Sequence, residues 1–304
     1  MIAEKKKDSL LSLIRGGQPM SLRQQLRLTV QLSAPAVMAQ ISSIIMQYID
    51  ASMVGRLGAE ASASIGLVST STWLFWGLCT AAATGFSVQV AHRIGARENR
   101  EARMVLRQSI VATLLFSFLL LSIGSAMSGA LPGWLGGGDV IRPDASRYFL
   151  IFCLSLPALQ LNFLAGGMLR CSGNMVVPSV LNALMCGLDV VFNLLLIFPS
   201  REVTLFGVGL TIPGAGLGVT GAALGTALAE VVIAVWMMWF LWTRSSELRL
   251  SGECGSFLPR VNCLRKAVRI GLPMGCEHII LCGAQILTTV IVAPLGTFAI
   301  AANS

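Results

Sequence analysis

The sequence predicts an all-α integral membrane protein, and its composition, its long uncharged stretches and an internal repeat support this prediction. Apolar residues make up 55% of the 304 residues, charged residues only 12%, and the mean hydropathy is +0.76. A soluble domain usually carries about 25% charged residues. The charges here are too few to cover a surface that faces water on all sides.

Hydropathy predicts six complete membrane spans and a seventh after them. The first contains 22 residues without a charge, from Leu28 to Ile49. At about 1.5 Å of rise per residue, such a helix crosses a bilayer core of about 30 Å. The spans run approximately over 28–54, 62–89, 106–130, 147–169, 176–198, 217–243 and 268–293. The connections 131–147 and 199–216 are rich in Gly and Pro and are predicted to be external turns.

The distribution of basic residues predicts the orientation. The first 27 residues are too polar for a signal peptide, and charged residues interrupt their apolar stretches. We therefore expect them to remain as a cytoplasmic N-terminus. Of the 22 basic residues, only Arg56, Arg142, Arg147 and Arg201 then lie outside, which leaves 18 inside. This asymmetry follows the positive-inside rule. The net charge of +8 therefore indicates orientation and contact with anionic membrane lipid, not a nucleic-acid partner.

An internal repeat predicts two similar lobes. With an offset of 238 residues, Pro35 matches Pro273, Gln47 matches Gln285 and Gly58 matches Gly296. Six spans separate the two copies, so both copies cross the membrane in the same direction. Parallel repeats of this kind are typical of transporters that work by alternating access.

The repeat also divides the chain into four predicted parts. These are a cytoplasmic segment (1–27), a six-helix N-terminal lobe (28–243), a cytoplasmic linker (244–267) and the start of a C-terminal lobe (268–304). If the second lobe matches the first, the complete protein has twelve helices. We expect this chain to end just after the first helix of the second lobe.

Four of the fourteen acidic residues fall inside predicted spans: Asp50, Asp189, Glu230 and Glu277. A charged residue at the bilayer centre costs about 2.5–3.5 kcal/mol on insertion scales. Carboxyl groups in such places are therefore candidates for binding a proton or a cation. Glu277 would be the acid of the second lobe, whereas Glu230 is either functional or a hydrogen-bond acceptor for a neighbouring helix.

Polar residues accompany two of these acids. Gln47 lies three residues before Asp50 and shares its helix face. In the fifth span, polar side chains spaced four, three and four residues apart form one stripe, which consists of Asn182, Cys186, Asp189 and Asn193. Such a stripe faces a cavity or another polar helix rather than lipid. A cation site is the first interpretation, and a structural network of interhelical hydrogen bonds is the alternative.

Two other patterns predict no separate chemistry. The eight cysteines form no CxxC motif and pair with no histidine, so we expect no metal site beyond Na⁺ at Asp50 and Asp189. The G-x-G-x-x-G at Gly216, Gly218 and Gly221 opens a membrane helix instead of following a strand, so it predicts no nucleotide site. Its glycines, together with Gly225, are spaced so that helices can approach closely.

Five stretches, in order, resemble the MATE (multidrug and toxic compound extrusion) family of cation-coupled antiporters. The first span has a similar P…D…G-x-L-G pattern, in Pro35, Asp50, Gly55 and Gly58. The others are GFSVQVAHRIGARENREA after the second span, LRCSGNMVVPS between the fourth and fifth, GLGVTGAALGTALAE opening the sixth, and IGLPMGCEH…LGTFAIAAN at the end. The resemblance extends from about Leu26 to Ser304.

The resemblance implies a twelve-helix protein whose two six-helix lobes expel organic, often cationic, compounds in exchange for H⁺ or Na⁺. It implies that Asp50 and Asp189 form the cation site of the N-terminal lobe. Family members often carry Asn four residues before the second acid, where this chain has Met185. Asn182 and Asn193 are hypothesised to substitute for it on the same face. Glu277 lies where some members have a Glu early in the seventh span.

Together these observations predict a secondary multidrug efflux antiporter in the plasma membrane, multi-pass, without a cofactor, which functions as a monomer when full length. Its lobes would rock between inward- and outward-open states, with Pro35 and Pro273 as helix bends. A lipid-linked oligosaccharide flippase is the nearest alternative, although no basic residue lies in the middle of a span. An intramembrane transferase is less favoured, because the chain has only two histidines, His92 and His278, and no D-x-x-D motif.

Overall fold

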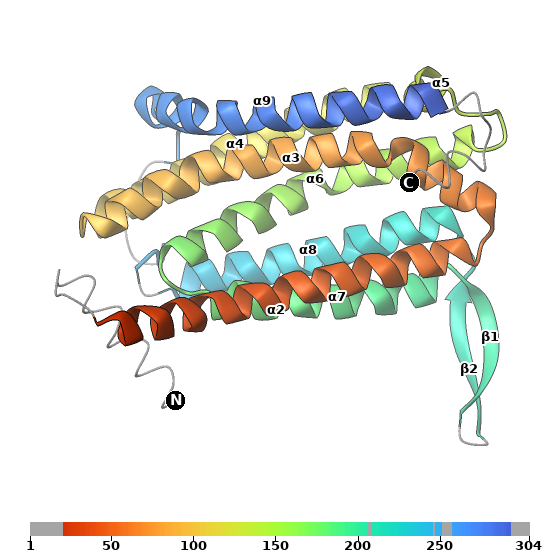
Figure 1. Cartoon of the computed structure of the whole chain (residues 1–304), viewed down its shortest axis with the longest axis horizontal. Helices are drawn as coiled ribbons and strands as arrows, with labels where there is room; N and C mark the ends of the chain where they lie inside the picture. Colours follow the sequence, from red (N-terminus) through yellow and green to blue (C-terminus); the bar gives the residue numbers. More distant parts are fainter. Residues whose placement is uncertain (1–20, 206–207, 246, 251–256, 293–304) are drawn as a thin grey trace.

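The computed structural model describes residues 21–205, 208–245, 247–250 and 257–292, in which long helices dominate (Figure 1). The elements are, in chain order, α2 (Leu22–Gly55), α3 (Ala59–Gly95), α4 (Asn99–Met127), α5 (Leu131–Trp134), α6 (Arg142–Cys171), α7 (Val176–Leu196), β1 (Pro199–Leu205), β2 (Val208–Ala215), α8 (Val219–Thr243) and α9 (Val261–Val292). Seven of the described helices are long and apolar enough to cross a membrane. The all-α membrane fold and the seven predicted spans are confirmed.

Several helices extend beyond the apolar stretch that predicts them. A capping box in which Ser21 accepts from the Gln24 backbone N–H fixes the start of α2, six residues before the predicted span. This arrangement satisfies two amide donors that the first turn would otherwise leave free. The apolar spans therefore mark only part of each of these helices, which continue into more polar stretches at their ends.

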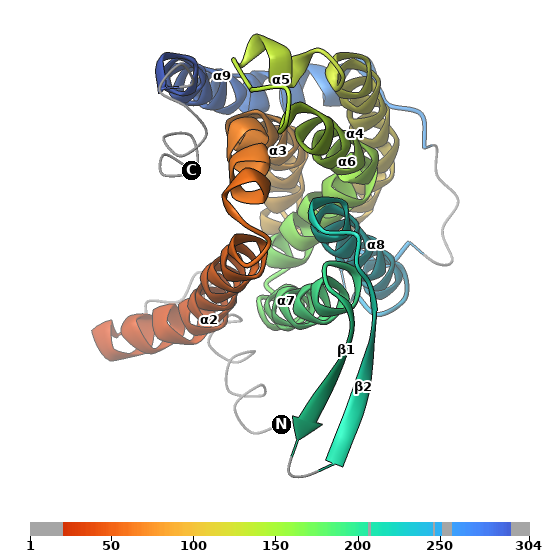
Figure 2. The same ribbon diagram turned by 90° about the vertical axis from the view of Figure 1, so that its right-hand side faces the viewer.

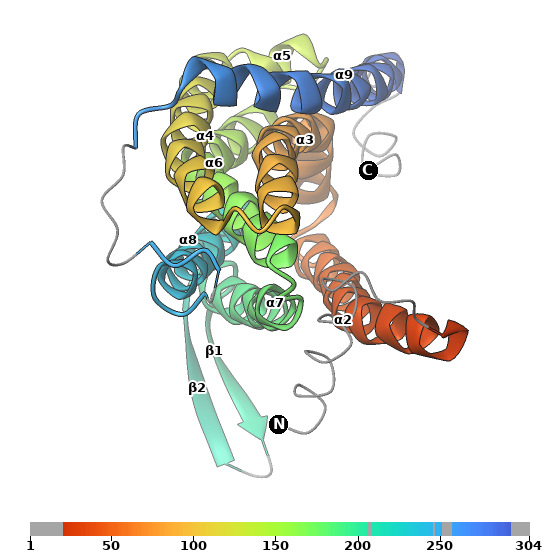
Figure 3. The same ribbon diagram turned by 90° about the vertical axis from the view of Figure 1, so that its left-hand side faces the viewer.

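The helices α3 and α6 form the centre of the bundle, and α2 and α9 lie at its edges. In the most apolar window of α3 and of α6, 50% and 56% of residues are buried, against 11% in α2 and 12% in α9. Viewed end-on, α2 lies beside α7 and diverges from α3, while α9 lies on the outer side of α3 (Figures 2 and 3). The site described below therefore lies where an edge helix meets the bundle.

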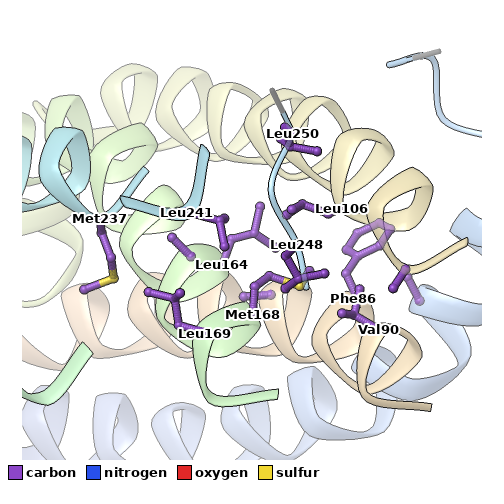
Figure 4. Close-up of a cluster of buried hydrophobic side chains, with 14 of the residues drawn as sticks. Phe86, Val90, Leu106, Leu164, Met168, Leu169, Met237, Leu241, Leu248 and Leu250 are labelled. Carbon is purple, nitrogen blue, oxygen red and sulfur yellow. The ribbon is translucent and has the colours of Figure 1, made fainter. Parts of the chain in front are cut away.

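Two large apolar clusters hold the bundle together, one toward each end. One surrounds Phe149, whose ring packs edge-on against Phe75 at 5.7 Å between centroids. The other, shown in Figure 4, joins α3, α4, α6 and α8 around Leu106 and Met168. Leu248 and Leu250, from the segment after α8, are buried in this second cluster. Part of the predicted linker thus belongs to the packed core.

Two arginines of α4 bind the backbone of that segment. Arg103 Nε donates to the Glu247 carbonyl at 2.9 Å, and Arg107 donates to the Leu250 carbonyl at 3.2 Å. Arg107 is only 4% exposed, and its guanidinium lies 5.8 Å from the centre of the Phe257 ring. The start of the linker is therefore attached to the first lobe by charged hydrogen bonds as well as by apolar contacts.

The prediction that residues 199–216 form only a turn is wrong. β1 and β2 pair as an antiparallel hairpin, with Val203 opposite Leu210. The hairpin projects away from the helices (Figure 1). Alternating β-branched and aliphatic residues explain it, at Val203, Leu205, Val208, Leu210 and Ile212. The Gly and Pro content of this stretch obscured that pattern.

The helix boundaries agree with the internal repeat. Displaced by 238 residues, the start of α2 at Leu22 falls on position 260, and α9 begins at Val261. Both helices run in the same direction across the bundle (Figure 1). The first helix of the predicted second lobe therefore begins inside the segment 244–267. Pro35 and Pro273 lie within the continuous helices α2 and α9, and their role as bends stays a prediction.

Candidate functional site

The fold brings the first two predicted acids together. Asp50 on α2 and Asp189 on α7 are both held by the side-chain amide of Asn193, one turn after Asp189 on the same helix. Asn193 Nδ2 donates to Asp50 Oδ1 at 3.0 Å and to Asp189 Oδ2 at 3.1 Å. Asp189 is 0% exposed and Asn193 1% exposed, while Asp50 is half-buried. The two carboxyl groups lie within hydrogen-bonding reach of each other.

Four further residues surround this pair. Tyr148 of α6 is close enough to interact electrostatically with both carboxyl groups. Thr226 of α8 lies beside Asp189, although its hydroxyl donates to the Ala222 carbonyl of its own helix at 3.2 Å. Cys186, one turn before Asp189, approaches Ser43 of α2. The site is thus assembled from α2, α6, α7 and α8.

The charge of the site is not balanced within the part of the chain that the structure describes. No Lys or Arg there forms an ion pair with Asp50 or Asp189. Asp189 Oδ1 and Asn193 Oδ1 are buried and have no hydrogen-bond partner among the described residues. Two adjacent carboxylates in a medium of low polarity repel each other strongly. A proton or a small cation between them would remove that repulsion.

The donor set fits a proton or a hard cation. All of the free ligand atoms are carboxylate or amide oxygens, which alkali and alkaline-earth cations prefer over soft transition metals. Among the described residues, no group of three or more His, Cys, Asp or Glu side chains could hold a metal ion. The donor set is therefore compatible with a proton or Na⁺, and Asn193 places the two carboxyl groups.

Close packing of α8 on α7 sets the position of Asn193. A Cβ atom added to Gly225 would collide with the Asn193 side-chain oxygen and lie 3.1 Å from its backbone nitrogen. One turn earlier, a Cβ at Gly221 would lie 2.9 Å from the Ile197 nitrogen. The glycine pair predicted to allow close helix approach therefore does so directly behind the candidate site.

Glu230 lies one turn beyond Thr226 on α8 and is 9% exposed. The Asn162 side-chain amide of α6 donates both to the Glu230 carboxyl group and, at 3.0 Å, to its backbone carbonyl. This double contact matches the simpler of the two interpretations of Glu230, that of an acceptor which joins neighbouring helices.

Three other predicted residues lie apart from this cluster. Gln47 is exposed on α2, and Asn182 lies two turns before Asp189; neither makes a hydrogen bond to another described residue. Glu277 is exposed on α9, whereas the neighbouring His278 packs against Gly77 of α3. Sequence reasoning missed Thr226 and Tyr148. The sequence contained a signal for each of them: Thr226 belongs to the family-like stretch GAALGTALAE, and Tyr148 is one of only two tyrosines in the chain.

Comparison with known proteins gives the family. The sequence model of the MatE family matches residues 35–195, just over half of the chain. A protein of Pseudomonas aeruginosa named multidrug resistance protein PmpM is 30% identical over 172 residues, which cover 54% of this chain and 33% of that protein. A protein of Shewanella oneidensis named FAD transporter is 23% identical over 172 residues, covering 57% and 38% of the two chains.

Solved structures share the fold. The inward-facing conformation of a multidrug resistance MATE transporter superposes with a TM-score of 0.73 at 22% identity, covering 84% of this chain and 55% of that one. A MATE transporter in complex with MaD3S gives a TM-score of 0.72 at 23% identity, with 82% and 53% covered. The chain thus spans about half the length of these structures, and its matched region about a third of the curated relatives. On the match of the family model and of the fold, this chain belongs to the MATE family of multi-pass membrane transporters.

Proposed function

We propose that the chain forms the N-terminal lobe of a secondary antiporter that exports small organic, often cationic, compounds across the plasma membrane in exchange for H⁺ or Na⁺. The observation that carries the proposal is the pair Asp50 and Asp189, bridged by Asn193 between α2 and α7. A transporter of this family has no need of enzymatic chemistry. The remaining predictions, a cytoplasmic N-terminus and a monomeric complete protein, belong to this proposal.

In the proposed mechanism, occupancy of the carboxyl pair controls the packing of α2. When a proton or Na⁺ neutralises the pair, α2 can stay against α7. When the pair is unoccupied, repulsion between Asp50 and Asp189 favours separation of α2, which is the least buried of the described spanning helices. Coupling requires the exported compound to favour one arrangement and the cation the other. Alternating access follows if the two lobes rock with this change.

The flippase remains the alternative function. A flippase would need basic side chains inside the membrane to hold a pyrophosphate. The middle of each described span contains no Lys or Arg. The site instead presents carboxylate and amide oxygens, which favours a cation as the coupling species.

A transport assay tests the proposal most directly. The gene encoding this chain is expressed in cells that lack their main efflux pumps, and ethidium extrusion is measured at two external pH values with and without Na⁺. We expect Asp50→Asn and Asp189→Asn each to abolish extrusion at an unchanged amount of protein in the membrane. Glu60→Gln is the matched control, because Glu60 is exposed at the same end of the bundle.

Binding to the purified chain separates the cation site from transport. We expect Na⁺ or lower pH to raise the unfolding temperature of the unaltered chain, and expect Asp189→Asn to remove that response. An unchanged response in Asp189→Asn would refute the cation site. Normal ethidium extrusion by both Asp variants would refute coupling through this pair.

A further inference from the structure

A basic cavity lies at the other end of the bundle from Asp50, between α3, α4 and the first turns of α9. Its volume is about 530 Å³. Two hydrogen bonds hold its walls together: Gln89 of α3 donates to the Cys263 carbonyl at 3.2 Å, and the Arg260 backbone N–H donates to Gln108 Oε1 of α4 at 3.2 Å. The cavity therefore lies where the first helix of the predicted second lobe meets the first lobe.

Basic side chains outnumber acidic ones in the lining of this cavity. Arg93, Arg260, Lys266 and Arg269 contribute, with Glu98 and Glu101 as the acidic members. Arg93 forms an ion pair with Glu98. Arg260, Lys266 and Arg269 form no ion pair with another residue in the described part of the chain. Lys266 and Arg269 are three residues apart, so they share one face of α9. Several positive charges thus surround one cavity with incomplete compensation.

The chemistry of this lining suits a phosphate group. Arg guanidinium groups bind phosphate oxygens through two parallel hydrogen bonds, and a Lys ammonium adds a compact positive charge. Basic pockets between membrane helices on the cytoplasmic side are typical binding sites of anionic lipid headgroups. The excess of basic residues at this end predicts that it faces the cytoplasmic leaflet.

Apolar side chains in the lining of the cavity favour a lipid over a soluble phosphate compound. Met104 and Val105 of α4 and Ile270 of α9 line the cavity together with its basic groups. A headgroup in the cavity would place its acyl chains over these residues. A soluble phosphate compound would gain nothing from them.

We propose that this cavity binds the phosphate headgroup of an anionic phospholipid, held by Arg260, Lys266 and Arg269. The bound lipid stabilises the contact of α9 with α3 and α4. The site does not depend on the exported compound or on the coupling ion, so it can be tested independently of transport.

The test measures the unfolding temperature of the purified chain in detergent during titration with phosphatidylglycerol or with phosphatidylcholine. We expect a saturable increase with phosphatidylglycerol only. The double variant Lys266→Gln/Arg269→Gln should raise the half-saturating lipid concentration by about tenfold or more. Each basic residue near an anionic membrane surface contributes about fivefold to the binding affinity. The conservative variant Lys266→Arg should retain binding.

The matched control is Arg244→Gln/Arg265→Gln, which removes the same charge from exposed positions of the described surface that do not line the cavity. An equal loss in both double variants would mean attraction to a diffuse positive surface and would overturn the site. Equal stabilisation by inorganic phosphate or glycerol phosphate would overturn the lipid assignment.

A second measurement covers the case in which the cavity variant fails to fold. Photoactivatable phosphatidylglycerol is crosslinked to the unaltered chain in vesicles, and the attachment site is located by mass spectrometry. We expect labelling to concentrate on residues 257–272 and on the facing turns of α3 and α4. Labelling spread evenly along the lipid-facing helices contradicts the proposal.

Discussion

Asn193 is the residue on which the candidate site depends most, because its amide contacts both carboxyl groups at once. Its Nδ2 donates to Asp50 and to Asp189, and its Oδ1 is buried without a hydrogen-bond partner among the described residues. An amide is neutral, so it orders the two acids without cancelling their charge. This leaves the negative charge available for a proton or Na⁺, as the proposed coupling requires.

We expect Asn193→Ala to weaken binding of the coupling cation by about tenfold, which corresponds to the loss of about one charge-assisted hydrogen bond. The measurement is the Na⁺ or pH dependence of the unfolding temperature of the purified chain. Asn182→Ala is the control, because Asn182 lies on the same helix and predicted stripe but two turns away. An equal effect of both substitutions would show that Asn193 has no special role.

At the scale of elements, the contact of α7 with α8 positions the site through glycine. Gly225 lies against Asn193 so closely that any Cβ atom must displace it. Gly221, one turn earlier on α8, lies similarly against the Leu196 carbonyl group. The interior of a protein does not relax freely around an added methyl group. The geometry of the acids on α7 therefore depends on a residue of α8 that carries no side chain.

Gly225→Ala is expected to destabilise the chain by about 1–3 kcal/mol and to weaken the cation response, since the added methyl group must push Asn193 away from the two acids. The comparison is with Gly187→Ala on α7, where an added Cβ meets no atom within 4 Å. Unfolding temperature and Na⁺ dependence are measured for both variants. Our account fails if Gly225→Ala behaves like Gly187→Ala.

The attachment of the linker to α4 gives a second prediction at this scale. Arg107→Met removes the hydrogen bond to the Leu250 carbonyl and leaves that carbonyl in an apolar environment, which should cost about 1–3 kcal/mol. We expect faster proteolysis after α8 in the purified chain. Arg100→Met, on the exposed first turn of the same helix, should leave the cleavage rate unchanged. Equal rates for the two variants would mean that Arg107 does not hold the linker.

At the scale of the whole molecule, two edge helices, α2 and α9, repeat each other in length, direction and sequence. Each packs on a different part of the bundle: α2 on α7 beside the acids, and α9 on α3 beside the basic cavity. The two are the least buried of the described spanning helices. The cation site and the cavity thus each lie at one of these edge contacts.

The predicted orientation can be tested with topology reporters. Green fluorescent protein fused after Arg249 should fluoresce, because the positive-inside rule places that segment in the cytoplasm. Alkaline phosphatase fused after Gly138, in the connection before α6, should be active, because the enzyme folds only outside. The reverse pattern would contradict the orientation and would place the basic cavity at the outer leaflet.

The amino-acid sequence by itself determined the membrane class, the seven spans, the parallel repeat and the acids Asp50 and Asp189. Each of these depends on composition or on spacing along one helix, which are local properties of the chain. Only the tertiary structure decided which polar residues meet. It joined Asn193 to both acids, added Thr226 and Tyr148, and left Gln47, Asn182 and Glu277 outside, because helix crossings depend on side-chain packing between distant segments. The basic cavity, built from three separate helices, likewise required contacts between distant segments that no single stretch specifies. The β-hairpin at 199–215 is local, and its alternating pattern was obscured by the Gly and Pro content of the same stretch.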